Sequence, residues 1–207
     1  MVATARGFIT DIILRTEKLR DYRRVEEITR EAFSYPGRIE LGGIGSPYEH
    51  WMVHELRKRD GIKELSLVAE AHKQLVGHII CSNARIDTPD GKSTLVLNFE
   101  PISVLPQYQK QGVGKALMHS MIDKAKGMGY GAIMFFGRPE YYPQFGFVEA
   151  AEYGVTDCNG KNFPAFIAME LKKGYLANVR GGKYFESDIL DDRKNGEALK
   201  EFDKSFR

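Results

Sequence analysis

Cysteine is scarce in this 207-residue sequence, and its two copies, Cys81 and Cys158, form no CxxC pair. A disulfide scaffold or a zinc knuckle is therefore not expected. Long hydrophobic runs are absent too: no stretch of about 18 apolar residues occurs, which excludes a membrane-spanning helix, and residues 1–10 show no secretory signal. We expect a cytoplasmic protein with reduced thiols and no membrane partner.

The sequence also lacks an excess of charge of one sign. Its 30 Lys and Arg residues against 28 Asp and Glu residues leave a net charge of +2, so no broad basic field favours nucleic acid. His50 and His54 lie four residues apart, but the HExxH order and a third ligand are missing, so no metal site is expected. The 43% hydrophobic content is that of a folded chain, and the length suits one domain.

Hydrophobic periodicity predicts the elements of the first half of the chain. They are a strand over Phe8–Leu14, a helix over Leu19–Phe33, a loop over Tyr35–Glu49, a helix over Tyr48–Arg59, a hairpin of Leu65–Ala71 and Leu75–Ala84, and a strand over Thr94–Val104. Pro101 interrupts the last of these strands. Because proline donates no ladder hydrogen bond, we expect a bulge near Pro101.

In the second half, a strand, a loop and a helix precede another strand, which implies a parallel strand pair joined by a right-handed crossover. The expected elements are a loop over Gln107–Gly114, a helix that reaches Met128, a strand over Ala132–Phe136, a short helix or turn over Pro139–Phe145 and a strand over Ala165–Leu171. With the hairpins, the sheet is expected to be mixed. Of the last 36 residues, 16 are charged, and we expect a helix over Asn195–Phe206 to dock through Leu199, Phe202 and Phe206.

The segment between the long strand and the next helix contains Gly112 and Gly114. Glycines at this spacing let several backbone N–H groups point one way, beside the positive end of the helix dipole, where phosphate oxygens bind. A P-loop is excluded because Gln109 and Ala116 stand at its required positions, and Leu117 excludes the dinucleotide fingerprint. A tight turn that only permits packing is the alternative.

The run Gln109-x-x-Gly112-x-Gly114 resembles the pyrophosphate-binding motif of the GNAT superfamily, the GCN5-related N-acetyltransferases. Further on, Tyr142-Pro143-Gln144-Phe145-Gly146-Phe147 is similar to the family's Tyr-x-x-x-Gly-Phe signature, and the longer run 137–147 resembles the YhbS-type branch of predicted bacterial N-acetyltransferases. The resemblance covers roughly residues 10–171. It implies an N-acetyltransferase domain over residues 1–171, with the charged extension 172–207 packed on the same domain.

The resemblance implies an α/β GNAT acyl-CoA N-acyltransferase fold, in which helices flank a mixed, twisted sheet with a splayed central strand pair. It also implies transfer of an acetyl group from acetyl-CoA, as co-substrate, to a primary amine of a small molecule or peptide in a ternary complex. Neither cysteine lies in the motifs, so an acetyl-cysteine intermediate has no support. The alternative is an acetyl-CoA-binding sensor without transfer activity. A homodimer is one conceivable assembly.

The family's binding roles fall on two segments of this chain. The backbone of Ile102, Ser103 and Val104 would bind the pantetheine arm. The amides of the following loop would bind the pyrophosphate, namely those of Gln109, Lys110, Gln111, Gly112, Val113, Gly114 and Lys115. The charges of Lys110 and Lys115 either assist there or are simply solvated.

The family's catalytic tyrosine aligns with Tyr142, whose phenol would protonate the departing thiolate because its pKa near 10 keeps the proton available. Tyr141 is the alternative, since the prolines around it leave the register open. Glu100, beside the expected bulge, is a candidate general base or a residue that orients substrate. Tyr48 and Trp51 either wall the acceptor site or pack in the core.

Overall fold

The computed structural model describes residues 11–34 and 48–206. These residues build one eight-stranded mixed sheet with the order β1-β2-β3-β4-β5-β7-β6, and β8 pairs with the outer side of β3. The strands are β1 (Ile13–Thr16), β2 (Leu67–Ala71), β3 (Gln74–Asp87), β4 (Ser93–Val104), β5 (Ala132–Phe136), β6 (Val148–Glu149), β7 (Phe166–Glu170) and β8 (Lys183–Phe185). β4 and β5 are the parallel pair, and the predicted mixed sheet is confirmed.

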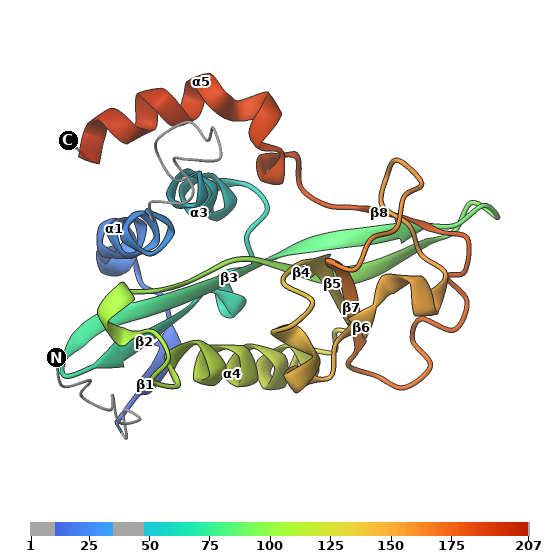
Figure 1. Ribbon diagram of the computed structural model, residues 1–207, viewed down its shortest axis with the longest axis horizontal. Helices are drawn as coiled ribbons and strands as arrows, with labels where there is room; N and C mark the ends of the chain where they lie inside the picture. Colours follow the sequence, from blue (N-terminus) through green and yellow to red (C-terminus); the bar gives the residue numbers. More distant parts are fainter. Residues whose placement is uncertain (1–10, 35–47, 207) are drawn as a thin grey trace, which may run out of the picture.

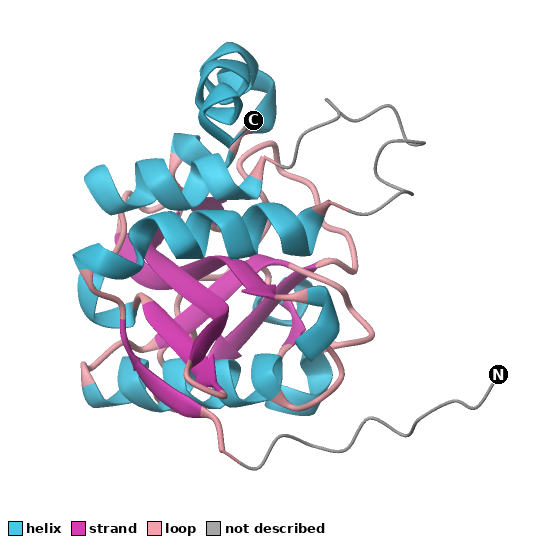
Figure 2. Ribbon diagram, turned by 90° about the vertical axis from the view of Figure 1, so that its left-hand side faces the viewer, coloured by secondary structure: helices cyan, strands magenta, loops and turns pink. Residues whose placement is uncertain are grey.

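Helices cover both faces of the sheet (Figure 1). On one face lie α1 (Tyr22–Phe33) and α3 (Glu49–Lys58), with α5 (Asp192–Asp203) outside α3, and on the other lies α4 (Val113–Gly127). Figure 2 shows the same layers from the side. No helix among residues 11–34 and 48–206 is long and apolar enough to cross a membrane.

α4 packs on the sheet through the apolar face that its sequence predicts. Leu117, Met118, Met121 and Ala125 are fully buried, at the three- and four-residue spacing of a helix face. They join the central core cluster, which also contains Phe99 of β4. The helix begins at Val113, so Gly114 belongs to its first turn and not to the preceding loop.

β1 differs from the predicted first strand. It spans Ile13–Thr16 and pairs with Leu67–Glu70 of β2, while the predicted start, Phe8 to Thr10, lies outside the described residues. Arg15 accounts for the shift, because its guanidinium binds Glu70 on β2 and Asp21 before α1. An edge strand held by ion pairs carries little hydrophobic alternation for a sequence pattern to detect.

The bulge expected near Pro101 is confirmed. Ile79 of β3 pairs with Ile102 and Cys81 pairs with Phe99, so Ile80 faces both Glu100 and Pro101. An extra residue on one strand bends that strand away from its other neighbour. β4 is registered with β5 at Leu97–Ile133, before the bulge.

The charged extension is more than a peripheral appendage, because it adds a strand to the sheet. β8 pairs with Arg85–Asp87 of β3, and the Tyr48 hydroxyl donates to the carbonyl of Ile189 over 2.8 Å. The predicted docking residues of the last helical segment make contacts: Leu199 is fully buried, the Phe202 ring lies 4.4 Å from that of His54, and the Phe206 ring lies 5.0 Å from that of His50.

Candidate active site

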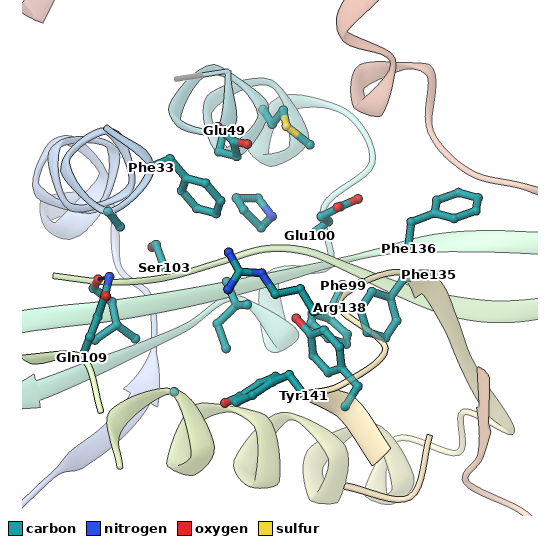
Figure 3. A pocket seen from close by; sticks show the side chains of 18 of the residues that line it. Phe33, Glu49, Phe99, Glu100, Ser103, Gln109, Phe135, Phe136, Arg138 and Tyr141 are labelled. Carbon is teal, nitrogen blue, oxygen red and sulfur yellow. Dashed lines mark hydrogen bonds between the residues drawn. The ribbon is translucent and has the colours of Figure 1, made fainter. Parts of the chain in front are cut away.

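A pocket of about 810 Å³ opens where β4 bends away from β5. Its walls come from the C-terminal ends of both strands, from α1 and α3 on one side, and from α4 with the segment after β5 on the other (Figure 3). The lining residues are Glu31, Ala32, Phe33, Ser34, Glu49, Met52, Phe99, Glu100, Pro101, Ile102, Ser103, Val104, Pro106, Gln109, Gly114, Phe135, Phe136, Gly137, Arg138, Tyr141 and Tyr142. The two sequence motifs, which begin at Gln109 and Tyr142, therefore meet at one cavity.

The end of β4 turns backbone groups into this pocket. Gly77 of β3 pairs with Val104 of β4. The next pair along the ladder is hydrogen-bonded, because the N–H of Leu105 donates to the carbonyl of Val76, so Gly77 and Val104 exchange no hydrogen bonds. In an antiparallel ladder such pairs alternate with bonded ones, so Ile102 and Val104 direct their N–H and C=O groups away from β3. Ser103 has its main chain on the β3 side, and its hydroxyl lies 3.0 Å from that of Thr29 on α1.

The loop between β4 and α4 is shaped by two residues in the left-handed region. Lys110 has φ of 61° and Gly112 has φ of 93°, a conformation that favours glycine. Gly112 precedes the first residue of α4, and the N–H groups of a helix's first turn have no carbonyl partners within the helix. The backbone therefore presents donors at the positive end of the helix, the arrangement that binds anions.

The side chains of the loop support this backbone without covering it. Gln109 donates to the carbonyl of Val104 over 3.0 Å, and Gln111 donates to the carbonyl of Gln107 over 2.6 Å. Lys110 and Lys115 are exposed. A Cβ placed on Gly114 would lie 3.7 Å from its nearest neighbours, the Tyr141 hydroxyl and Val104, which is ordinary van der Waals contact.

Tyr142 is the buried one of the two adjacent tyrosines. It is 9% exposed, whereas Tyr141 is 39% exposed, and its ring lies 4.7 Å from that of Phe135. Burial, with a smaller contribution from Glu100, raises the pKa of Tyr142 well above its usual range, so the phenol stays protonated at neutral pH. Tyr141 also lines the pocket, with its hydroxyl over Gly114 at the start of α4.

Glu100 stands at the bulge on the face of the sheet opposite Tyr141 (Figure 3). Burial raises the pKa of Glu100 well above its usual range, and the nearby carboxyl groups of Glu186 and Glu49 raise it further. This carboxyl group therefore keeps its proton to higher pH than an ordinary glutamate does. The structure thus places two titratable side chains, those of Glu100 and Tyr142, at one cavity.

Seven of the predicted site residues line the pocket, namely Tyr142, Glu100, Ile102, Ser103, Val104, Gln109 and Gly114. The others, Lys110, Gln111, Gly112, Val113 and Lys115, belong to the turn and helix start at its edge. Tyr48 and Trp51 do not line it. They are 4% and 6% exposed in the core cluster under α3, and Glu49 and Met52 of that helix face the pocket instead.

Sequence reasoning missed Arg138, which follows β5 and extends toward the pocket (Figure 3). Its place directly after a buried strand and before the tyrosine motif was the available signal. It also missed Glu186, which lies 86 residues beyond Glu100 and has no motif around it. No group of three or more His, Cys, Asp or Glu side chains is placed to hold a metal ion within residues 11–34 and 48–206.

Comparisons with known proteins agree with this geometry. The Acetyltransferase (GNAT) family model matches residues 22–147. The uncharacterized N-acetyltransferase YjhQ of Escherichia coli is 34% identical over 114 residues, which cover 55% of this chain and 62% of the relative, so the match spans less than two thirds of that protein.

Two solved structures share the fold over most of their length. The GNAT family N-acetyltransferase YhbS from Escherichia coli, in complex with CoA, has a TM-score of 0.70 and 25% identity, with 84% of this chain and 90% of that one covered. A GNAT family acetyltransferase from Brucella melitensis, in complex with acetyl-CoA, has a TM-score of 0.67 and 24% identity, with 87% and 99% covered. The predicted fold, with its YhbS-type likeness, is confirmed, and the chain belongs to the acetyltransferase (GNAT) family.

Proposed function

We propose that this protein transfers the acetyl group of acetyl-CoA to a primary amine by direct attack in a ternary complex. The observation that carries the proposal is the pocket at the β4–β5 splay, which Tyr142 and Glu100 both line beside the open backbone of β4. The CoA in the YhbS crystal structure supports it, because that protein shares the fold over most of both chains.

The cofactor arm binds along β4 in this mechanism. The N–H and C=O groups of Ile102, which point away from β3, pair with the amides of pantetheine, and the carbonyl of Val104, which accepts from Gln109, has a second lone pair for the arm. Ser103 holds the strand against α1. The amides of residues 109–115 bind the pyrophosphate at the start of α4, with Gly112 and Gly114 allowing close approach. Lys110 and Lys115 lie exposed at the edge of this turn, where their charges complement the phosphates.

Acetyl transfer requires that a proton is removed from the ammonium group of the acceptor and that a proton is supplied to the departing thiolate. Glu100 accepts a proton from the ammonium group of the acceptor, and the resulting amine forms a C–N bond with the thioester carbonyl carbon. The N–H of Val104 polarises the carbonyl oxygen. As the C–S bond breaks, Tyr142 gives its proton to the thiolate, and the phenol then regains a proton from solvent while Glu100 and the new amide release theirs.

Release of free CoA from acetyl-CoA, measured across a panel of polyamines, aminoglycosides, amino acids and peptide N-termini, tests the proposal. We expect amine-dependent release by the wild-type protein. Glu100→Gln is expected to reduce it at unchanged acetyl-CoA affinity. Thermal stabilisation by acetyl-CoA without release for any amine would contradict transfer and identify a sensor.

A further inference from the structure

A buried polar cluster lies behind Glu100, and the C-terminal extension supplies half of it. Asn98 of β4 donates from Nδ2 to Oε2 of Glu186 over 2.8 Å, and the Tyr184 hydroxyl lies 3.3 Å from the same carboxylate oxygen. The Tyr184 hydroxyl donates to the carbonyl of Met134 over 2.8 Å, which holds its ring beside the middle of β5. Glu186 follows β8 directly, so the pairing of β8 with β3 holds its carboxyl group in place.

Asn98 connects this cluster to the pocket. Asn98 and Glu100 are two residues apart on β4, so their side chains leave the same face of the sheet about 7 Å apart along the strand. Phe99, between them, points to the other face and joins the core under α4. Asn98 is 0% exposed, and its Oδ1 accepts no hydrogen bond from any residue that the structure describes. A buried oxygen of this kind favours a nearby hydrogen-bond donor.

We propose that the C-terminal extension completes the acceptor site: Glu186, fixed by Asn98 and Tyr184 behind the pocket, is a positioning residue that sets the charge of Glu100, and Glu100 receives the acceptor as a primary ammonium ion. This inference rests on the proposed function and deepens it. The family model ends at residue 147, so the residue at issue lies outside the segment that defines the family.

The charges around Glu100 favour a cation at this end of the pocket. Glu186 approaches from the extension and Glu49 from α3, and both raise the pKa of Glu100. Burial raises the pKa of Glu186 itself to about 7, against the hydrogen bonds from Tyr184 and Asn98 that lower it. Tyr142 and Tyr184 are neutral near pH 7, because burial raises the pKa of each. Among the described residues that line the pocket, Arg138 is the one with a positive charge, and its exposed side chain comes from the opposite wall.

Binding of an ammonium ion changes which protonation state of these carboxyl groups is favoured. In the empty pocket their mutual repulsion favours the protonated form of at least one of them. The positive charge of the acceptor stabilises Glu100 as a carboxylate, which can then take the ammonium proton. A neutral hydroxyl acceptor gains nothing from this arrangement, so the site selects amines.

A pH titration of Glu100 tests, without any acceptor, whether Glu186 sets the charge of Glu100. The probe is the full-length protein labelled with carboxyl-¹³C glutamate and observed by NMR between pH 4 and 9, with the Glu100 signal assigned by its loss in Glu100→Gln. We expect the midpoint of Glu100 to move down by about one pH unit in Glu186→Gln, which removes a neighbouring negative charge. Glu197→Gln is the matched control, an exposed glutamate of the same extension, and it should leave the midpoint unchanged.

A kinetic measurement adds the acceptor. With a primary-amine probe such as a polyamine that supports CoA release, Glu186→Gln is expected to raise the KM for the amine about tenfold, to shift the acid limb of the pH–rate profile to lower pH, and to leave acetyl-CoA affinity unchanged. An unmoved Glu100 midpoint in Glu186→Gln would overturn the inference even in an active enzyme. A shifted Glu100 midpoint without turnover for any amine would support the coupling between Glu186 and Glu100 but contradict the proposed function.

Discussion

The side chain of Gln109 donates a hydrogen bond to the backbone carbonyl of Val104 over 3.0 Å. This contact ties the loop before α4 to the end of β4, the two segments expected to bind opposite ends of the cofactor. Because the carbonyl of Val104 points away from β3, Gln109 takes the place that a neighbouring strand would otherwise fill. It therefore fixes the distance between the two binding segments.

Gln109→Ala should weaken binding of acetyl-CoA about fivefold, since one hydrogen bond that organises the site contributes about 1 kcal/mol. Isothermal titration with acetyl-CoA measures the effect. Gln111→Ala is the control, because the Gln111 side chain bonds to Gln107 within the same loop and does not reach β4. Equal losses in both variants would mean that loop order in general, and not the link to Val104, matters.

Gly114→Leu should abolish detectable binding of acetyl-CoA while the protein stays folded. A Cβ on Gly114 meets its nearest neighbours at an ordinary 3.7 Å, so the first carbon of a side chain fits there. We expect the rest of the leucine side chain to extend into the space proposed for the phosphate. Gly127→Leu, at the other end of α4 with nothing within 4 Å of its Cβ, is the size-matched control. Gly112 is a poorer test, because its φ of 93° strains any substitution. Undiminished binding in Gly114→Leu would place the cofactor elsewhere.

Tyr142→Phe should lower kcat by about 100-fold or more, the range for loss of a general acid, at unchanged affinity for acetyl-CoA. The hydroxyl is removed but the ring that packs on Phe135 remains, so the melting temperature should change little. Tyr141→Phe tests the neighbouring hydroxyl over Gly114 in the same assay. A large loss in Tyr141→Phe with normal turnover in Tyr142→Phe would exchange their roles.

Glu186→Gln should change how stability depends on pH. Burial raises the pKa of Glu186 from 4.5 to about 7, so the folded state holds a proton that the unfolded state releases. The stabilisation from this proton is complete below pH 4.5 and is lost as the pH rises through 7. The glutamine variant has no carboxyl proton to release, so it does not lose stability in this way. Its free energy of unfolding should therefore rise relative to wild type by about 2 kcal/mol between pH 5 and 8, allowing for partial exposure.

Chemical unfolding in guanidinium at pH 5, 6, 7 and 8 measures this difference. Glu197→Gln, an exposed glutamate of α5, should follow the wild-type curve at every pH. A Glu186→Gln curve parallel to wild type would show that Glu186 titrates normally in the folded protein.

Local chemistry made parts of the fold predictable from sequence. Proline cannot donate to a ladder, so Pro101 located the bulge, and the four-residue spacing of Leu117, Met121 and Ala125 located α4. Gly112 and Gly114 indicated the turn between β4 and α4, because glycines at this spacing allow a tight backbone turn. The same reasoning could not find the limits of β1, whose place depends on Arg15 and its partners in β2 and before α1.

The sequence alone determined the family and the two motifs, because a backbone that approaches a phosphate and a phenol that keeps its proton each need particular residues at short spacing. Only the tertiary structure decided which tyrosine is buried and that Glu100 has Glu186 as a neighbour. Burial and electrostatic coupling depend on distances through space, and residues 86 positions apart carry no local pattern that records them.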